Sequence, residues 1–539
     1  MVFQSFSFLF IFLPVTLVGY YCLRTTRYAN WFLLLSSLYF YSAEAVWFIF
    51  PLLTSSLFDY FAGLFMKKRN EDAKFRKKLL ISSICVNLGF LAIFKYTTWL
   101  SGHLSALFGL MGIAMTPLII PLPPGISFYT FQSMSYTIDI YKREFQPTKN
   151  LIDFISYVSF FPQLIAGPIM RAKDLLPQLS QIRPVPSFNV FSHALYLIIF
   201  GLFMKLVIAD NLGGIVENVE SLISPDRELT AGLGLVFAYG FTFQIYCDFY
   251  AYSTIARGAA KMFGINLMWN FNSPYISSNP SDFWRRWHIS LSTWLRDYLY
   301  VALGGNQGGR LLTLRNLLIT MAIGGLWHGA GVLFIIWGIF HGLLLVVYRV
   351  APIDEWCQRI LGKRLGTFVG IFIFFHLVVI GWIFFRADPN NLSAIFGSIF
   401  LIPSAISAHI SNYMNYFDNL PTFNTASQMA SAQTSLSDYI HIYSEQLSKV
   451  IGLWIGTILG TVKGYFGTHW YFTVYMYGVL AYAWPMWASD WLASSKKVEF
   501  GDLFLFMPFT IRLLLILTFF YAIVILGRRD AIDFIYFAF

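Results

Sequence analysis

Two histidines stand in apolar segments of this chain, and their settings suit proton transfer. His328 lies in residues 321–330, which read MAIGGLWHGA, with no carboxylate beside it. Forty residues earlier, His288 lies among tryptophans and arginines in residues 283–298, FWRRWHISLSTWLRDY. A titratable side chain at membrane depth costs free energy, so such residues are usually functional. Burial favours the neutral imidazole, which is the form that serves as a general base for a hydroxyl nucleophile.

Each histidine also has a structural interpretation, and both interpretations stay open at this stage. His328 could be a packed core residue bonded to backbone carbonyls. The glycines around it favour function, because they let another backbone or a ligand approach the ring (Gly324, Gly325 and Gly329). His288 could orient a carbonyl or an acceptor, or it could bond Ser292 one turn away. His341 and His376 also lie in apolar stretches, where we expect a packing role.

Arginines next to His288 are the expected binding site for a group donor that carries phosphates, which we call the donor site. Arg285 and Arg286 are placed to hold an anion, and Arg296 could join them, because guanidinium groups bind phosphates well. Snorkelling to lipid phosphate is an equal alternative. The donor site that we expect also contains Trp284, Trp327 and Ser292. No HExxH-like or Cys/His ligand spacing occurs and the four cysteines are scattered, so neither a metal site nor a disulfide framework is expected.

Composition places the chain in a membrane. Its 539 residues are 57% hydrophobic and only 12% charged, whereas soluble domains carry about 25% charged residues. We therefore expect an all-α, polytopic membrane protein. The net charge of +10 fits basic loops that orient the helices, and the sequence shows no basic patch interleaved with stacking aromatics that would indicate nucleic-acid binding.

Apolar runs of about 20 residues predict eleven to fourteen membrane helices, some of them re-entrant. The expected spans are at about 6–22, 30–44, 46–66, 79–99, 104–122, 126–141, 151–169, 189–209, 231–252, 312–329, 331–348, 366–385, 470–490 and 504–526.

Charge bias orients these helices. The basic loop between Lys67 and Lys78 should be cytoplasmic, which places the N-terminus outside. Residues 387–448 contain no Lys or Arg and should face away from the cytoplasm. We therefore divide the chain into a membrane core (1–386), an extracytoplasmic loop with possible short helices (387–469) and C-terminal membrane helices (470–539).

The segment around His288 has its own pattern. Its aromatic and leucine side chains recur every three or four residues from Phe283 to Tyr298, which predicts one amphipathic helix. Pro280 precedes it, and Ser281 is a plausible N-cap. A basic, Trp-rich helix of this kind suits the membrane interface or the wall of a cytoplasmic funnel.

At these residues the chain resembles the membrane-bound O-acyltransferase family, and within it the alginate O-acetyltransferase branch. The similarity runs from Met1 to about Ala387 and resumes near Phe534. The segments that carry it are 124–131 (PGISFYTF), 161–168 (FPQLIAGP), 270–275 (NFNSPY), 282–290 (DFWRRWHIS) and 325–330 (GLWHGA). Residues 248–254 read DFYAYST, where the branch often has DFSGYSD.

The resemblance implies a ring of helices around a thin core, with a cytoplasmic funnel leading to the family histidine, here His328. The second family position falls on His288. In this branch acetyl from a cytoplasmic donor, with acetyl-CoA expected and no cofactor bound, crosses the bacterial inner membrane. A periplasmic SGNH-type acetyltransferase partner then modifies an exported polysaccharide such as alginate or cellulose. Two alternatives stay open: transfer of D-alanine or another acyl group from a carrier protein, and a non-catalytic conduit for a partner enzyme.

Overall fold

The structure is a computed structural model, and it describes most of the chain. The described residues are 1–26, 28–165, 167–222, 232–400, 474–490, 492–493, 500–528, 532 and 534–535. Most of the expected extracytoplasmic loop, 387–469, lies outside them. Within these ranges every regular element is a helix, and the all-α, membrane-spanning fold class is confirmed.

The described helices form two compact units. Met1–Gly213, Thr242–Arg386 and Tyr482–Phe539 make the first unit, and Gly214–Phe241 and Ala387–Ala481 make the second. The N-terminal helices are η1 (Ser7–Phe12), α1 (Leu13–Leu23), α2 (Ala29–Ser42), η2 (Val46–Phe48), α3 (Ile49–Lys68), α4 (Ala73–Leu91), η3 (Ala92–Tyr96), α5 (Thr97–Leu110), α6 (Ile126–Tyr141), α7 (Leu151–Ser159), α8 (Phe161–Leu164) and α9 (Ala172–Ser180).

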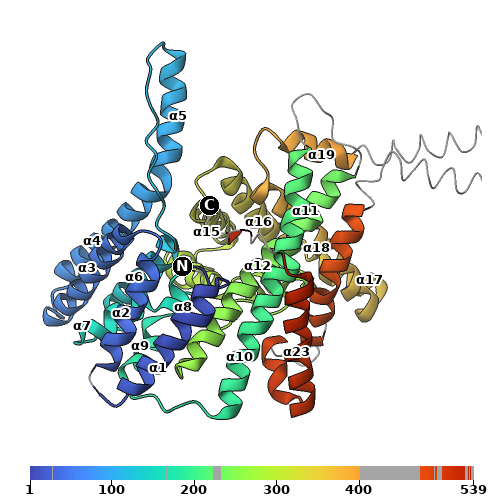
Figure 1. Cartoon of the computed structure of the whole chain (residues 1–539). Helices are drawn as coiled ribbons and strands as arrows, with labels where there is room; N and C mark the ends of the chain where they lie inside the picture. The colour runs from blue at the N-terminus through green and yellow to red at the C-terminus, as the bar shows by residue number, and fades with distance from the viewer. Residues whose placement is uncertain are drawn as a thin grey trace, which may run out of the picture. The chain divides into compact units, whose positions relative to one another are not determined.

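The middle and C-terminal helices include those that carry both histidines (Figure 1). They are α10 (Phe188–Phe203), η4 (Met204–Ala209), α11 (Asp210–Ser221), α12 (Leu233–Met262), η5 (Pro274–Ile276), α13 (Pro280–Arg286), α14 (Ile289–Trp294), η6 (Leu295–Tyr300), α15 (Arg310–His328), α16 (Val332–Val350), α17 (Ile353–Leu361), α18 (Lys363–Arg386), α19 (Leu392–Phe400), α22 (Phe500–Leu503), η8 (Phe504–Phe506) and α23 (Phe509–Leu526). In the second unit the start of α12 packs on α19, where Gly232 N–H donates to Ser398 O at 3.0 Å.

Six helices in the described part of the chain are long and apolar enough to cross a membrane. They are Val46–Lys68, Ala73–Leu110, Phe188–Ser221, Val332–Val350, Lys363–Arg386 and Phe509–Leu526, and a shorter apolar helix covers Ser7–Leu23. Other expected spans are helical but shorter or more polar. The clearest case is α6, which is 16 residues long and buries Gln132, Ser133 and Asp139. It is an inner helix whose polar groups face other helices.

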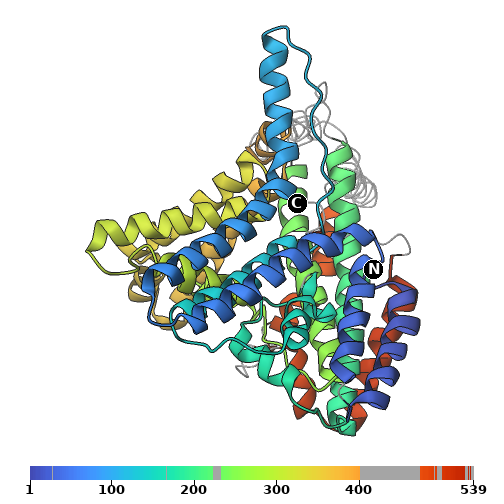
Figure 2. The ribbon, with the colours of Figure 1, turned by 90° about the vertical axis from the view of Figure 1, so that its left-hand side faces the viewer.

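The prediction of a membrane span at 104–122 is wrong. One continuous helix of 38 residues, Ala73–Leu110, covers this span's first part and the preceding span, and residues 113–122 have no helical structure. Gly112 has a positive φ of 76°, and prolines at 117 and 121 cannot supply helical N–H groups. The returning segment lies against α5 instead, and the Ser101 hydroxyl donates to Leu118 O at 3.2 Å. This hairpin stands clear of the neighbouring helices of its unit (Figures 1 and 2).

Helices α15 and α16 form a tightly packed hairpin, and His328 is the last residue of α15. Two glycines face each other across it. A Cβ on Gly338 would lie 2.3 Å from Met321 O, and one on Gly325 would lie 2.2 Å from Phe334 O. Small residues at such positions let two helix backbones approach closely inside a membrane. This close approach fixes the helix that ends in the family histidine.

The prediction of a single amphipathic helix around His288 is wrong, because the structure has two helices there. Helix α13 ends at Arg286, and α14 begins at Ile289. Between them His288 has φ 41° and ψ 56°, in the left-handed region. The N-cap is also different: Asn279, not Ser281, accepts from Asp282 N–H at 2.8 Å. The spacing of apolar residues continues across the break, so periodicity alone does not reveal it.

We predict that Gly338→Ala destabilises the protein, because the added methyl group must push α15 and α16 apart. Overpacking of this kind costs about 1–3 kcal/mol. Thermal unfolding in detergent should shift to lower temperature. Gly102→Ala is the matched control, because a Cβ there meets nothing within 4 Å, and this change should leave the midpoint unchanged or raise it slightly. Equal effects of the two changes would contradict the close approach.

Candidate active site

The backbone around His288 is held by the segment 270–275. Asn272 N–H donates to Arg286 O, and Ile289 N–H donates to Asn270 O, each at 2.9 Å. The side-chain oxygen of Asn270 also accepts from the Ser290 hydroxyl at 2.7 Å. These bonds lie on both sides of His288. They stabilise a left-handed conformation that a non-glycine residue seldom adopts.

The imidazole of His288 is fully buried among aromatic rings. Its centroid lies 4.6 Å from that of Phe249 and 6.2 Å from that of Trp327. The expected alternative in which the Ser292 hydroxyl bonds this ring is not what the structure shows. The Ser292 hydroxyl donates to Trp287 O at 2.9 Å instead.

His328 is the last residue of α15 and is 3% exposed. Its ring lies 4.9 Å from Trp327, 5.0 Å from Trp337 and 5.3 Å from Phe385. Trp327 therefore contacts both histidines. The two residues, 40 positions apart in sequence, belong to one buried cluster of aromatic rings.

A cavity of about 460 Å³ reaches His328 from one side, and we call it the histidine cavity. Its wall contains the chain's N-terminus and polar groups from three helices. The lining residues that matter here are Met1, Glu44, Lys95, Ser127, Trp327 and His328. Among the residues named as a donor site from the sequence, only Trp327 lines this cavity.

A second cavity, of about 440 Å³, lies beside the α13–α14 segment, and we call it the arginine cavity. Four of the expected donor residues line it: Trp284, Arg285, Ser292 and Arg296. Arg286 does not, because its guanidinium is turned to Asp282 at 2.9 Å and to Asn272 O at 3.3 Å. Arg349, which the sequence did not single out, lines the cavity as well.

The indole ring of Trp337 lies between one residue of the arginine cavity and one residue of the histidine cavity. Trp337 lies 5.8 Å from Trp284, which lines the arginine cavity. It lies 5.0 Å from His328, which lines the histidine cavity. His341 packs beside this ring at 4.9 Å and, 0% exposed, is buried between Trp337 and Phe283. The two cavities thus approach each other across a thin aromatic layer.

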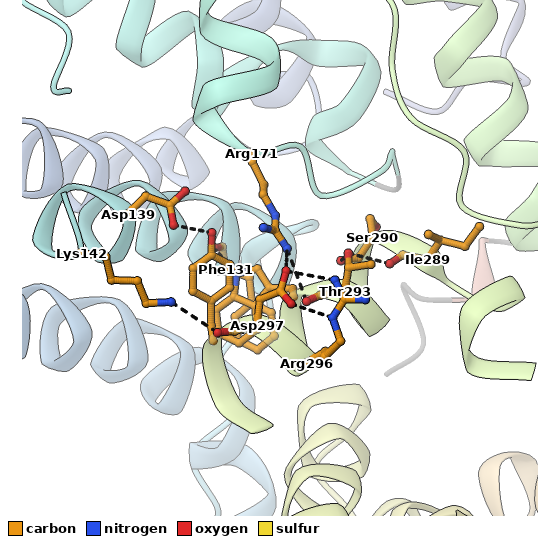
Figure 3. Close-up of polar contacts among 11 residues, drawn as sticks. Phe131, Asp139, Lys142, Arg171, Ile289, Ser290, Thr293, Arg296 and Asp297 are labelled. Carbon is orange, nitrogen blue, oxygen red and sulfur yellow. Dashed lines mark hydrogen bonds and ion pairs between the residues drawn. The ribbon is translucent and has the colours of Figure 1, made fainter. Parts of the chain in front are cut away.

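A network of charges fixes the rim of the arginine cavity (Figure 3). Asp297 accepts from Arg296 Nε at 2.7 Å and pairs with Arg171. Arg171 also donates to Thr293 O at 3.4 Å, and Lys142 approaches Asp297 O at 3.5 Å. Burial alone would raise the pKa of Asp297, but the bonds from Arg296 and Arg171 outweigh it and hold that pKa below its usual value. Arg296 is therefore oriented by the carboxylate of Asp297.

Lys95 is the site residue that sequence reasoning missed. It lies within the expected span 79–99, is 8% exposed and lines the histidine cavity. A lysine inside an apolar run was a signal available in the sequence. Its partners could not be seen there, because they belong to a helix more than 200 residues away.

Comparison with known proteins identifies the family of this chain and several relatives. Residues 12–380 match the MBOAT, membrane-bound O-acyltransferase family. The Pseudomonas aeruginosa protein named probable alginate O-acetylase AlgI is 41% identical over 391 residues, 72% of each chain. A Helicobacter pylori peptidoglycan O-acetyltransferase is 32% identical over 492 residues, 82% of this chain and 90% of the relative. A Bacillus subtilis teichoic acid D-alanyltransferase is 27% identical over 285 residues, covering 49% of this chain and 69% of the relative.

The chain belongs to the membrane-bound O-acyltransferase family. The chain is therefore an O-acyltransferase and a multi-pass membrane protein. The expected likeness to the alginate O-acetylase branch is confirmed by the identity to its members.

We predict a pH-dependent effect of Asp297→Asn on thermal stability. A carboxylate with a lowered pKa stabilises the fold above the unfolded-state pKa of about 4, and this contribution is lost as the pH falls further. The midpoint difference from wild type should be full near pH 6 and should shrink below about pH 4. Glu355→Gln is the control, because its pair with Arg359 is solvent-exposed. A difference for Asp297→Asn that is independent of pH would contradict this prediction.

Proposed function

We propose that this protein transfers acetyl from cytoplasmic acetyl-CoA across the bacterial inner membrane for O-acetylation of an exported polysaccharide. The observation that carries the proposal is the single indole, Trp337, between a residue of the arginine cavity and His328. An acetyl group is small. A donor held by arginines on one side and an acceptor hydroxyl beside His328 on the other could meet without a transport cycle.

Contacts within the first unit support the sidedness. Arg76, beside the basic loop, donates to Tyr141 O at the end of α6 at 2.8 Å. At that same end of α6, Asp139 accepts from Tyr298 of η6 at 2.7 Å. The arginine cavity, which η6 helps to line, therefore belongs to the end that the positive-inside rule assigns to the cytoplasm. The histidine cavity includes Met1, which fits an outside N-terminus.

The chemistry requires one base and one anion-binding wall. In the proposed reaction the acceptor hydroxyl oxygen attacks the thioester carbonyl carbon, and His328 takes the hydroxyl proton. The tetrahedral intermediate collapses, the C–S bond breaks, and the proton passes to the departing thiolate. His288 orients the thioester carbonyl or the acceptor. Arg285, Arg296 and Arg349 hold the phosphates of coenzyme A.

The names of an alginate O-acetylase and a peptidoglycan O-acetyltransferase among the relatives support an exported polysaccharide as the final acceptor. Alginate and cellulose are the candidates that we expect from the sequence. We propose that an SGNH-type acetyltransferase outside the membrane receives the acetyl group. The stretch 387–448, which is free of Lys and Arg, is the candidate for docking this partner. The D-alanyltransferase relative favours a second candidate, in which an acyl group comes from a carrier protein. Capture of an acyl carrier protein in place of acetyl-CoA turnover would favour it.

We predict that His328→Ala abolishes transfer of labelled acetyl from acetyl-CoA by the reconstituted protein. The reason is loss of the base, so the amount of folded protein in the membrane should be normal. His376→Ala is the matched control, because that imidazole is exposed and bonds the backbone of its own helix at Phe372 O. Full activity of His328→Ala would contradict the proposed role of His328 as the base. No turnover by wild type, with or without the partner, would favour a conduit.

We also predict that Arg285→Ala raises the KM for acetyl-CoA more than it lowers kcat. A hydrogen bond between charged groups contributes about 1.5–3 kcal/mol, which corresponds to roughly a 10- to 100-fold rise. Arg359→Ala, in an exposed pair on α17, should change neither constant. An unchanged KM in Arg285→Ala would remove this arginine from the donor site.

A further inference from the structure

We propose that Lys95 and Tyr96 form a clamp on the C-terminal end of α15 and thereby position His328. This inference rests on the proposed role of His328 in acyl transfer. It adds two positioning residues, neither of which is part of the sequence motifs that point to the site.

The clamp begins with a lysine whose amine bonds backbone carbonyls inside the protein. Lysines within apolar helices commonly extend to the interface. The Lys95 ammonium instead donates to Trp327 O at 2.6 Å and to His328 O at 2.8 Å. It also lies 5.8 Å from the ring centroid of Trp327. A buried amine with this arrangement is held by the backbone carbonyls at the end of α15.

The next residue extends the clamp. The Tyr96 hydroxyl donates to Leu326 O at 2.6 Å. Three consecutive carbonyls, those of residues 326, 327 and 328, are thus satisfied by two adjacent side chains. The last four carbonyls of any helix lack partners within it, and they carry a partial negative charge that a cation stabilises.

The geometry of both segments explains why side chains bond the end of α15. After His328 the chain leaves α15 through Gly329, whose backbone is extended at φ −158° and ψ 154°, so the left-handed C-cap that would satisfy these carbonyls is not formed. Within the helix Ala73–Leu110, Lys95 and Tyr96 belong to the π-helical turn η3. Such turns insert a residue, re-aim side chains and occur often at functional sites.

The clamp also places the Lys95 amine in the wall of the histidine cavity. Lys95 and His328 both line this cavity. The third proton of the ammonium points towards the Ser127 hydroxyl at a longer distance of 3.5 Å. Loss of the clamp would release the end of α15, and a displacement of about 1 Å at a catalytic group can cost about 100-fold in rate.

The test compares three substitutions in the full-length protein with its partner. Lys95→Met keeps the length of the side chain without its charge, and we expect kcat to fall about 100-fold while the KM for acetyl-CoA changes little. Lys95→Arg should restore part of this loss, because it keeps the charge and the donors. Tyr96→Phe removes only one hydroxyl and should lower kcat by a smaller factor. Lys363→Met, at the start of α18, is the control for loss of a lysine.

The outcomes separate the clamp from the proposed function. An active Lys95→Met beside an inactive His328→Ala would overturn the clamp alone. An active His328→Ala would overturn the proposed function. If Lys95→Met fails to fold, Tyr96→Phe decides: a fall in kcat at unchanged KM and unchanged thermal midpoint supports the clamp, and wild-type kcat overturns it. A rise in KM without a change in kcat would also overturn it.

Discussion

Backbone polar groups inside a bilayer must find partners within the protein, and this requirement governs the whole site. Both histidines lie where a helix is interrupted. At His288 the segment 270–275 supplies the missing bonds, and at His328 the side chains of η3 do. The region around both histidines therefore depends on distant parts of the chain that converge on it. Its rigidity comes from the same bonds.

Aromatic packing complements these bonds. Trp284, Trp327 and Trp337 surround the histidines with flat, apolar walls. Such walls offer water few hydrogen-bonding partners. They also leave the imidazoles in a medium of low polarity, where fixed dipoles act more strongly than in water. The close approach of Gly325 and Gly338 keeps α15 and α16 from separating and admitting solvent.

Much of this could be predicted from the sequence, since histidines in apolar runs are costly and their glycine and tryptophan neighbours are visible. The membrane class follows from composition alone. Three features could not be predicted. The break at His288 is hidden because helical spacing continues through it, and the non-helical return at 113–122 is as apolar as a helix. Lys95 depends on carbonyls of a helix distant in sequence, which no local pattern encodes.

The two cavities share no lining residue. Substitutions in one wall therefore leave the other wall chemically intact, and the aromatic layer between them can stay constant. In evolutionary terms the walls of the two cavities are separately variable parts of one protein. The relatives' names refer to alginate, peptidoglycan and teichoic acid, and a fold divided in this way lets one wall change while the other is kept.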